Sequence, residues 1–359
     1  MRGGPVRKCR LLGLAVLIFT ITPGANAQAN PGRGTAPTPP SRIVVVHHAA
    51  ATEAFVPQPE KVRQMVQQGL TRLTGKPTVS DAWRTMVSPK DIVGIKVFTA
   101  PGRDAGTRAT VVEAVVEGLI QAKHPASNIL IWDKQRADLR RAGYMELAAR
   151  YGVRVEGSAD AGYDETTAYT PDRPMPGQLV YGDLEFGKKG DGVGRRSFVS
   201  KLVVKGMTRI INITPLLNHN TAGVSGHLYS LALGSVDNSI RFENDLFRLS
   251  VAVPEIYALP TLSDRVILNI TDALICQYQG EQSGLLHYST TLNELRFSKD
   301  PVALDSLSLR ELERIRVSNV PTLREHSLTN QLELLHNAAL LELGVSEEPR
   351  IKVERVHLP

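Results

Sequence analysis

The feature that most constrains the fold of this 359-residue chain is an alternation of strand-like and helix-like segments. Short runs of β-branched and other apolar residues are each followed by a longer stretch with apolar residues at helical spacing. Such alternation is typical of βαβ units. We therefore predict an α/β fold with a mostly parallel or mixed sheet flanked by helices.

In the first half, the pattern predicts strands at 42–48, 91–98, 128–133 and 153–157. It predicts intervening helices at 59–75, 108–123 and 136–152. The segment 158–200 breaks this rhythm, because it is rich in glycine, proline and other turn formers. We expect an irregular insertion there, with a hairpin at 178–186.

The alternation resumes in the second half with 201–206, a strand at 209–214 and a helix from about Gly223. The later expected elements are a helix at 243–259 interrupted at Pro254, a strand-rich segment at 265–278, helices at 299–316 and 330–344, and a strand at 350–356. We expect one α/β domain over 42–359. Two packed subdomains, 42–157 and 201–359, are the alternative.

Residues 1–29 have the order of a secretory signal peptide: basic residues, a short apolar run and then small residues. We expect cleavage near Ala27 or Ala29, a Pro/Gly linker over 30–41, and a periplasmic or secreted protein. An uncleaved anchor is the alternative, but the run from Leu11 to Ile21 is too short to span a bilayer comfortably. No later stretch is apolar enough, so we expect no transmembrane segment in the mature chain.

The net charge and the cysteine content limit which partners and cofactors we expect. The net charge of +6 falls to +2 without residues 1–29, which carry four basic residues and no acidic ones. We therefore expect no nucleic-acid partner. Cys9 leaves with the signal peptide and Cys276 stands in an apolar context. One cysteine cannot form an internal disulfide or a cysteine-ligated cluster, so no iron–sulfur cluster is expected.

The stretch "INITPLLNHNTAGVSGHLYSLALGS" (211–235) places polar residues between two apolar runs. We expect the strand to end at Pro215. Four polar residues then follow beyond its carboxyl end, where open α/β sheets bind ligands: Asn218, His219, Asn220 and Thr221. The following helix start would suit an anion. Helix capping by Thr221 or Ser225 is the alternative explanation.

A family resemblance rests on the blocks "VGIKVF" with "ATVVEAVVEGLIQA", "NILIWD", "INITPLLNHNTAGVSGHLYSLALGSVDNSIRF", "ITDAL" and "SKDPVALD". On these blocks, from roughly Arg42 to Glu313, the chain resembles the family catalogued as domain of unknown function 362. Relative to that family's pattern, Asn218 replaces a lysine, Tyr229 and Ser230 replace a Lys-Asn pair, and Phe98 replaces an asparagine. Many relatives carry an added ferredoxin-like module, for which this chain lacks the cysteines.

What remains of the family pattern implies a site at the strand ends. Lys96, Asp133 and His219 are the candidate catalytic residues, with an ordinary salt bridge as the alternative role for Lys96 and Asp133. Arg241 could hold a carboxylate or phosphate through its planar fork. The full set of candidate ligand-binding residues is Asn218, Asn220, Thr221, Ser225, Arg241 and Asp272.

Three functions fit these residues. The one we favour is binding, with transformation, of a small anionic molecule around His219, whose imidazole would move protons. The second is metal binding, for which the side-chain types fit but the spacing carries no motif; its candidate ligands are His47, His48, His219 and His227. The third is a non-catalytic binding or accessory subunit of a periplasmic complex, which the departures at Phe98, Asn218 and Tyr229 favour. The sequence identifies no cofactor.

Overall fold

The computed structural model describes Met1 and residues 40–188, 191–280, 283–319 and 329–359. The expected signal peptide (1–29) and nearly all of the linker (30–41) lie outside the described residues. All the elements below belong to one compact unit, Pro39–Pro359.

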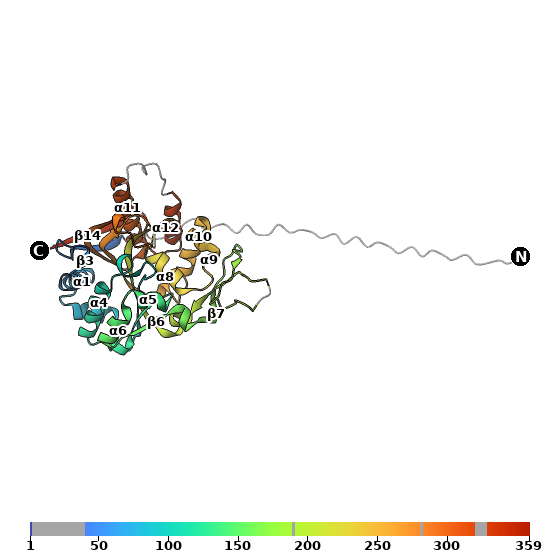
Figure 1. The fold of residues 1–359 in the computed structure, drawn as a ribbon, viewed down its shortest axis with the longest axis horizontal. Coiled ribbons are helices and arrows are strands. Elements are labelled where there is room, and N and C mark those ends of the chain that lie inside the picture. Colours follow the sequence, from blue (N-terminus) through green and yellow to red (C-terminus); the bar gives the residue numbers. More distant parts are fainter. Residues whose placement is uncertain (2–39, 189–190, 281–282, 320–328) are drawn as a thin grey trace, which may run out of the picture. The chain divides into compact units, whose positions relative to one another are not determined.

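A nine-stranded sheet forms the centre of this unit (Figure 1). Eight strands follow the order β15-β1-β14-β13-β11-β4-β5-β6, and β12 pairs with β11. Within the eight, only β14 runs antiparallel to its neighbours. Their bounds are β1 Ser41–His48, β4 Val93–Lys96, β5 Ile129–Asp133, β6 Arg154–Gly157, β11 Arg209–His219, β12 Gly223–Val224, β13 Val266–Gln277, β14 Ser289–Ser298 and β15 Ile351–Leu358. The predicted α/β class with a mixed sheet is confirmed.

Both halves of the chain contribute to this sheet. β4 pairs with β11, with Lys96 opposite Asn212. β1 lies between β14 and β15 at the other end of the strand order. The segments 42–157 and 201–359 therefore share the central sheet.

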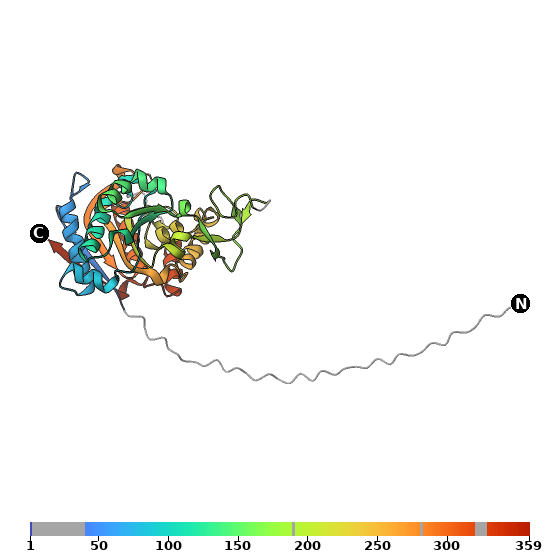
Figure 2. The same cartoon turned by 90° about the horizontal axis from the view of Figure 1, so that it is seen from below.

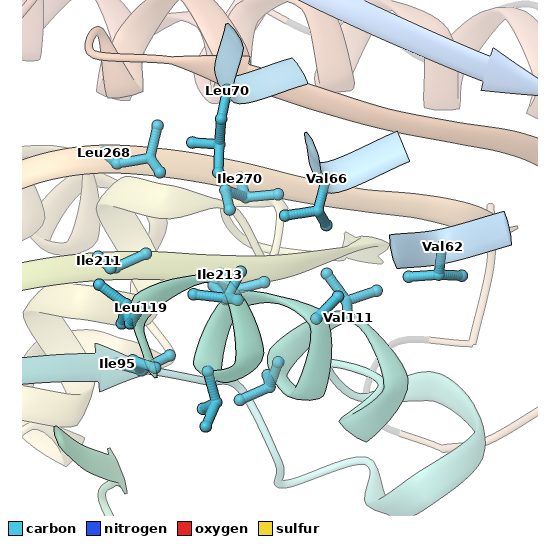
Figure 3. Close-up of a cluster of buried hydrophobic side chains, with 14 of the residues drawn as sticks. Val62, Val66, Leu70, Ile95, Val111, Leu119, Ile211, Ile213, Leu268 and Ile270 are labelled. Atoms are coloured by element: carbon cyan, nitrogen blue, oxygen red, sulfur yellow. The ribbon is translucent and has the colours of Figure 1, made fainter. Parts of the chain in front are cut away.

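The longer helices form two groups, one on each face of the sheet (Figure 1). The first group is α1 Pro59–Thr74, α2 Val79–Met86, α4 Ala109–Gln121 and α6 Tyr144–Tyr151; the second is α8 His227–Ser235, α10 Leu246–Tyr257, α11 Pro301–Asn319 and α12 Thr329–Leu340. Successive residues of a strand point to opposite faces. Ile211 and Ile213 accordingly pack against α1 and α4 (Figure 3). Ile210 packs in the second group, and Asn212 donates to the carbonyl of His227 there.

The helices expected at 136–152 and 243–259 differ from the sequence expectation. The expected helix at 136–152 is divided into α5, Arg136–Arg141, and α6, because Gly143 adopts φ 87° between them. The interruption expected at Pro254 does not occur, and α10 continues through it. Proline leaves the carbonyl four residues earlier without its helical donor. That carbonyl, on Ser250, accepts instead from Asn337 Nδ2 of α12 at 3.0 Å.

The prediction that Pro215 ends a strand was wrong, as was the helix start near Gly223. β11 continues to His219, turns, and pairs with β12, and α8 begins only at His227. Pro215 is tolerated because β4 pairs no further than Asn212 and because a register irregularity follows it opposite β13.

The insertion at 158–200 lies on the β6 side of the sheet, far from α1 in both views (Figure 2). It contains α7 Ser158–Ala161, β7 Tyr163–Tyr169, β8 Gly177–Gln178, β9 Val193–Gly194 and β10 Ser197–Ser200. β7 pairs with β10, and β8 pairs with β9. The hairpin expected at 178–186 is thus replaced by a wider pairing, with turns at 181–188. The segment 202–206 forms a π-helical turn.

Across the described ranges, no helix combines the length and apolarity needed to cross a lipid bilayer.

Candidate functional site

The ion pair between Lys96 and Asp133 joins the ends of β4 and β5. Lys96 is fully buried, and its Nζ donates to Asp133 Oδ1 at 2.8 Å, to Val97 O at 2.6 Å and to Ser230 Oγ at 3.0 Å. Burial lowers the pKa of Lys96, and Asp133 opposes that shift. Because an ammonium has three donors, the protein itself uses all of them.

The Asp133 carboxylate is equally occupied. Its Oδ2 accepts from both the backbone N–H and the hydroxyl of Thr99, at 2.8 and 2.7 Å. Its Oδ1 also accepts from the Lys134 N–H at 2.8 Å. The pair therefore connects β4, β5 and α8. Its geometry is that of an ordinary structural salt bridge, the alternative role considered for these two residues.

His219 holds its own turn. Its Nδ1 accepts hydrogen bonds from the N–H groups of Thr221 and Ala222, at 3.2 and 3.0 Å. The ring lies against Tyr229, with 4.4 Å between ring centroids. An imidazole nitrogen that accepts hydrogen bonds carries no proton of its own.

Two other polar residues of this turn contact each other: Asn218 Nδ2 donates to Asn220 Oδ1 at 3.4 Å. Ser225 is fully buried. The cavity beside Asn218, His219 and Asn220 has a volume of about 80 Å³. Ligand pockets usually span about 300–1,000 Å³, so this cavity has room for water rather than for a metabolite.

α8 links these two groups of residues without joining them into one site. Tyr229 contacts His219, and the next residue, Ser230, binds Lys96. Tyr229 also lies edge-on to Phe98, with 6.2 Å between ring centroids, and its hydroxyl bonds to Glu243 Oε1 at 3.1 Å. No direct contact between Lys96 and His219 is found among the described interactions.

Arg241 lies away from the strand ends that hold Lys96 and His219. Its guanidinium donates to Ser197 Oγ and to Met175 O, at 2.9 and 3.0 Å, and lies over the rings of Tyr169 and Phe242. Burial lowers its pKa. It anchors the insertion to α9, Ile240–Glu243.

The four histidines proposed as metal ligands do not gather. The ring of His47 lies beside that of His357 of β15, tilted by 57°, and His48 accepts from the Ala50 N–H. His227 is fully buried at the start of α8, where burial lowers its pKa to about 3. Within residues 40–188, 191–280, 283–319 and 329–359, no three histidine, cysteine or acidic side chains are placed to share a metal ion.

Asp272 forms the second buried ion pair at this edge of the sheet. Its Oδ2 lies 3.1 Å from Arg108 Nη1 and accepts from the Arg108 backbone N–H at 3.0 Å. Asp272 is thus bound to a residue that directly precedes α4. Arg108 Nη1 is buried and makes no hydrogen bond of regular geometry.

Arg108 also lines a cavity of about 660 Å³, the largest of the cavities described here. Its walls are residues 54–57, 103–104, 108–110, 113, 142–143, 146–147, 150, 275 and 286, and we call it the Arg103 cavity. The loop after β4, the hairpin after β1 and the end of β13 all contribute to it. It therefore lies beyond the carboxyl ends of parallel strands, where α/β sheets bind ligands.

The cavity contains unused donors. The α4 N-terminus has no side-chain cap, and the N–H groups of Ala109 and Thr110 have no hydrogen-bond partner among the described residues. The exposed guanidinium of Arg103 lies against Gly143 and makes no ion pair or hydrogen bond among the described residues. Free N–H groups and a guanidinium at a helix start favour an anion.

A second cleft, of about 450 Å³, lies beyond β5. Its only lining lysine is Lys134, whose Nζ donates to Ser239 Oγ at 2.6 Å. Three lining carboxylates surround it, from Asp160, Asp183 and Glu243. The excess of negative charge makes this cleft a poor site for an anion.

The sequence reasoning missed Arg103 and Arg108. Both stand in "APGRDAGTRAT", between a predicted buried strand and a predicted helix. Arginines in a glycine-containing loop at that position carry the same signal that singled out the turn at 218–221.

Comparison with known proteins adds little. No family model matches the chain, and the search of curated proteins finds no match. A crystal structure of a Thermotoga maritima protein is similar, with a TM-score of 0.39 and 11% sequence identity. The likeness covers 75% of this chain and 60% of that one, so this chain spans less than two thirds of that protein.

Proposed function

We propose that the protein binds a small organic anion in the Arg103 cavity. The observation that carries this proposal is the set of unused donors in one cavity: the Ala109 and Thr110 N–H groups and the Arg103 guanidinium. An anion placed there would complete the capping of α4 and neutralise an unpaired arginine.

The proposal keeps the small anionic ligand expected from the sequence and moves its site away from His219. Lys96, Asp133 and His219 are held by hydrogen bonds within the protein. These bonds support a structural role for the three residues and a binding function for the protein. Lys96 and Asp133, whose polar atoms are all engaged, would have to break those bonds before they could act on a substrate, and His219 Nδ1 would have to release two backbone donors.

Calorimetric titration with hexanoate and pentylamine tests this function, because the two probes share a pentyl tail and differ in charge. We expect hexanoate to bind at least about tenfold more tightly, since hydrogen bonds to charged groups contribute about 1.5–3 kcal/mol. Arg103→Gln should remove most of that preference. Arg84→Gln, at a surface arginine paired with Asp81, is the matched control.

Equal binding of the two probes would contradict the proposal. An unchanged preference in Arg103→Gln would contradict the assignment of the anion to this cavity.

We also propose that the protein acts in the periplasm or outside the cell, after cleavage near Ala27 or Ala29. The support is the basic, apolar and small-residue order of residues 1–29. N-terminal sequencing of the protein from its own host tests this, and a chain that retains Met1 would contradict it. Membership of the family of domain of unknown function 362 remains a proposal on the sequence blocks alone.

A further inference from the structure

The Arg103 cavity has an apolar side that binding of a simple anion would not use. Three of its residues are large apolar side chains with much exposed surface: Phe55 is 40% exposed, Val56 61% and Leu286 56%. Ile275 lies deeper and is buried. Exposed apolar side chains that gather around one cavity mark a place where a partner's apolar surface is removed from water.

The turn that carries Phe55 is strained. β2, Thr52–Glu53, pairs with β3, Val56–Pro57, so Ala54 and Phe55 form a two-residue hairpin loop. Both residues have positive φ, 46° and 64°. Such loops ordinarily use asparagine, aspartate or glycine, because a bulky side chain is disfavoured there.

The surrounding structure keeps this hairpin in place. Thr52 Oγ1 bonds to Asn293 Oδ1 at 2.6 Å, and Asn293 Nδ2 donates to Ala49 O at 2.9 Å. Asn293 itself has φ 54°. A phenylalanine held in a conformation that suits glycine indicates that its side chain is needed at the cavity.

The charges of the cavity limit the ligand to one negative charge. Arg108 is paired with Asp272, and Arg150 is paired with Glu113 at 2.5 Å. Arg103 is therefore the one lining arginine without an ion pair among the described residues. The carboxylates of Asp104 and Glu146 also line the cavity, so the lining has no excess of positive charge and disfavours a ligand with more than one negative charge.

We propose that the ligand is an amphipathic monoanion: a carboxylate with an aliphatic chain. The carboxylate would lie at Arg103 and the start of α4, and the chain would lie against Phe55, Val56 and Leu286. This inference rests on the proposed function, because it assumes that the anion occupies this cavity.

Calorimetry with butyrate, hexanoate, octanoate and decanoate tests whether the ligand's aliphatic chain contributes to binding. Burial of a methylene contributes about 0.8 kcal/mol, which corresponds to about a fourfold gain in affinity. We expect affinity to rise by up to about that factor for each added methylene, until the cavity is filled. Inorganic phosphate should bind more weakly than octanoate.

The variant Phe55→Gly tests the contact between Phe55 and the ligand's aliphatic chain without disturbing the fold. Glycine suits the positive φ, so the variant should fold at least as stably as the parent. It should nevertheless bind octanoate several-fold more weakly and leave butyrate binding nearly unchanged. Phe247→Ala, which removes an exposed phenylalanine of α10, is the control and should change neither.

The outcomes distinguish the two proposals. Equal affinity along the carboxylate series, or unchanged octanoate binding in Phe55→Gly, would overturn the amphipathic ligand and leave the anion site standing. Octylamine binding as tightly as octanoate would overturn the anion site. No binding of any carboxylate would overturn both.

Discussion

Arg108 and Asp272, 164 residues apart in the chain, form a buried ion pair beneath the start of α4. The pair ties the loop after β4 to the middle of β13, and both elements contribute to the Arg103 cavity. Its position explains how a long-range contact fixes the geometry of a ligand site that neither segment could form alone.

Replacing Arg108 should lower the free energy of unfolding of the protein. Arg108→Met leaves Asp272 buried without its cationic partner, and loss of one partner of a buried pair costs about 3–5 kcal/mol. Urea denaturation measures the loss. Arg84→Met, at the surface, should cost less than about 1 kcal/mol. If the two variants are equally stable, the buried pair does not contribute as described.

Lys96→Met should be similarly destabilising, by about 3–5 kcal/mol, since Asp133 would lose its buried counter-charge. The double variant Lys96→Met with Asp133→Asn should recover part of this loss, because no buried charge is then left unpaired and the amide oxygen can still accept from Thr99. Chemical denaturation of both variants and of the exposed-site control Lys90→Met checks the prediction. A double variant less stable than Lys96→Met would contradict it.

His219→Ala should destabilise the protein by about 1–2 kcal/mol, because the Thr221 and Ala222 N–H groups lose their acceptor. His219→Asn offers an amide oxygen in place of Nδ1 and should restore most of the stability. Thermal unfolding of the three proteins compares them. Equal stability of the Ala and Asn variants would argue against a structural role for this nitrogen.

Asp305 should make stability depend on pH. Its carboxylate accepts from the His227 and Leu228 N–H groups, at 2.7 and 2.9 Å, and burial raises its pKa from 3.8 to about 7. Between about pH 4 and 7 the unfolded carboxyl is ionised while the folded one keeps its proton. This group's contribution is therefore full below pH 4 and is lost as the pH rises toward 7.

The expected slope from Asp305 approaches about 1.4 kcal/mol for each pH unit in that window. Unfolding free energies at pH 4, 5, 6 and 7 should therefore fall more steeply for the parent than for Asp305→Asn. Asp264→Asn, at an exposed position, is the control. Parallel pH profiles of the parent and Asp305→Asn would contradict the raised pKa.

The strand and helix pattern was readable from the sequence because it depends on local periodicity. The apolar positions of α1 follow helical spacing within the predicted range 59–75, and Gly75 ends the helix in a left-handed conformation. Asp300 caps α11, because its Oδ1 accepts from the Ala303 N–H. Such features involve residues only a few positions apart.

The candidate site depended on contacts that no local pattern contains. The sequence identified Lys96 and Asp133 as partners at neighbouring strand ends, and the ion pair is present. It did not reveal that Thr99 and Ser230 complete their hydrogen bonds, or that His219 caps its own turn. Which loop donors stay unused, as at Arg103 and the start of α4, is decided by segments distant in the chain, because only their packing determines which polar groups find partners.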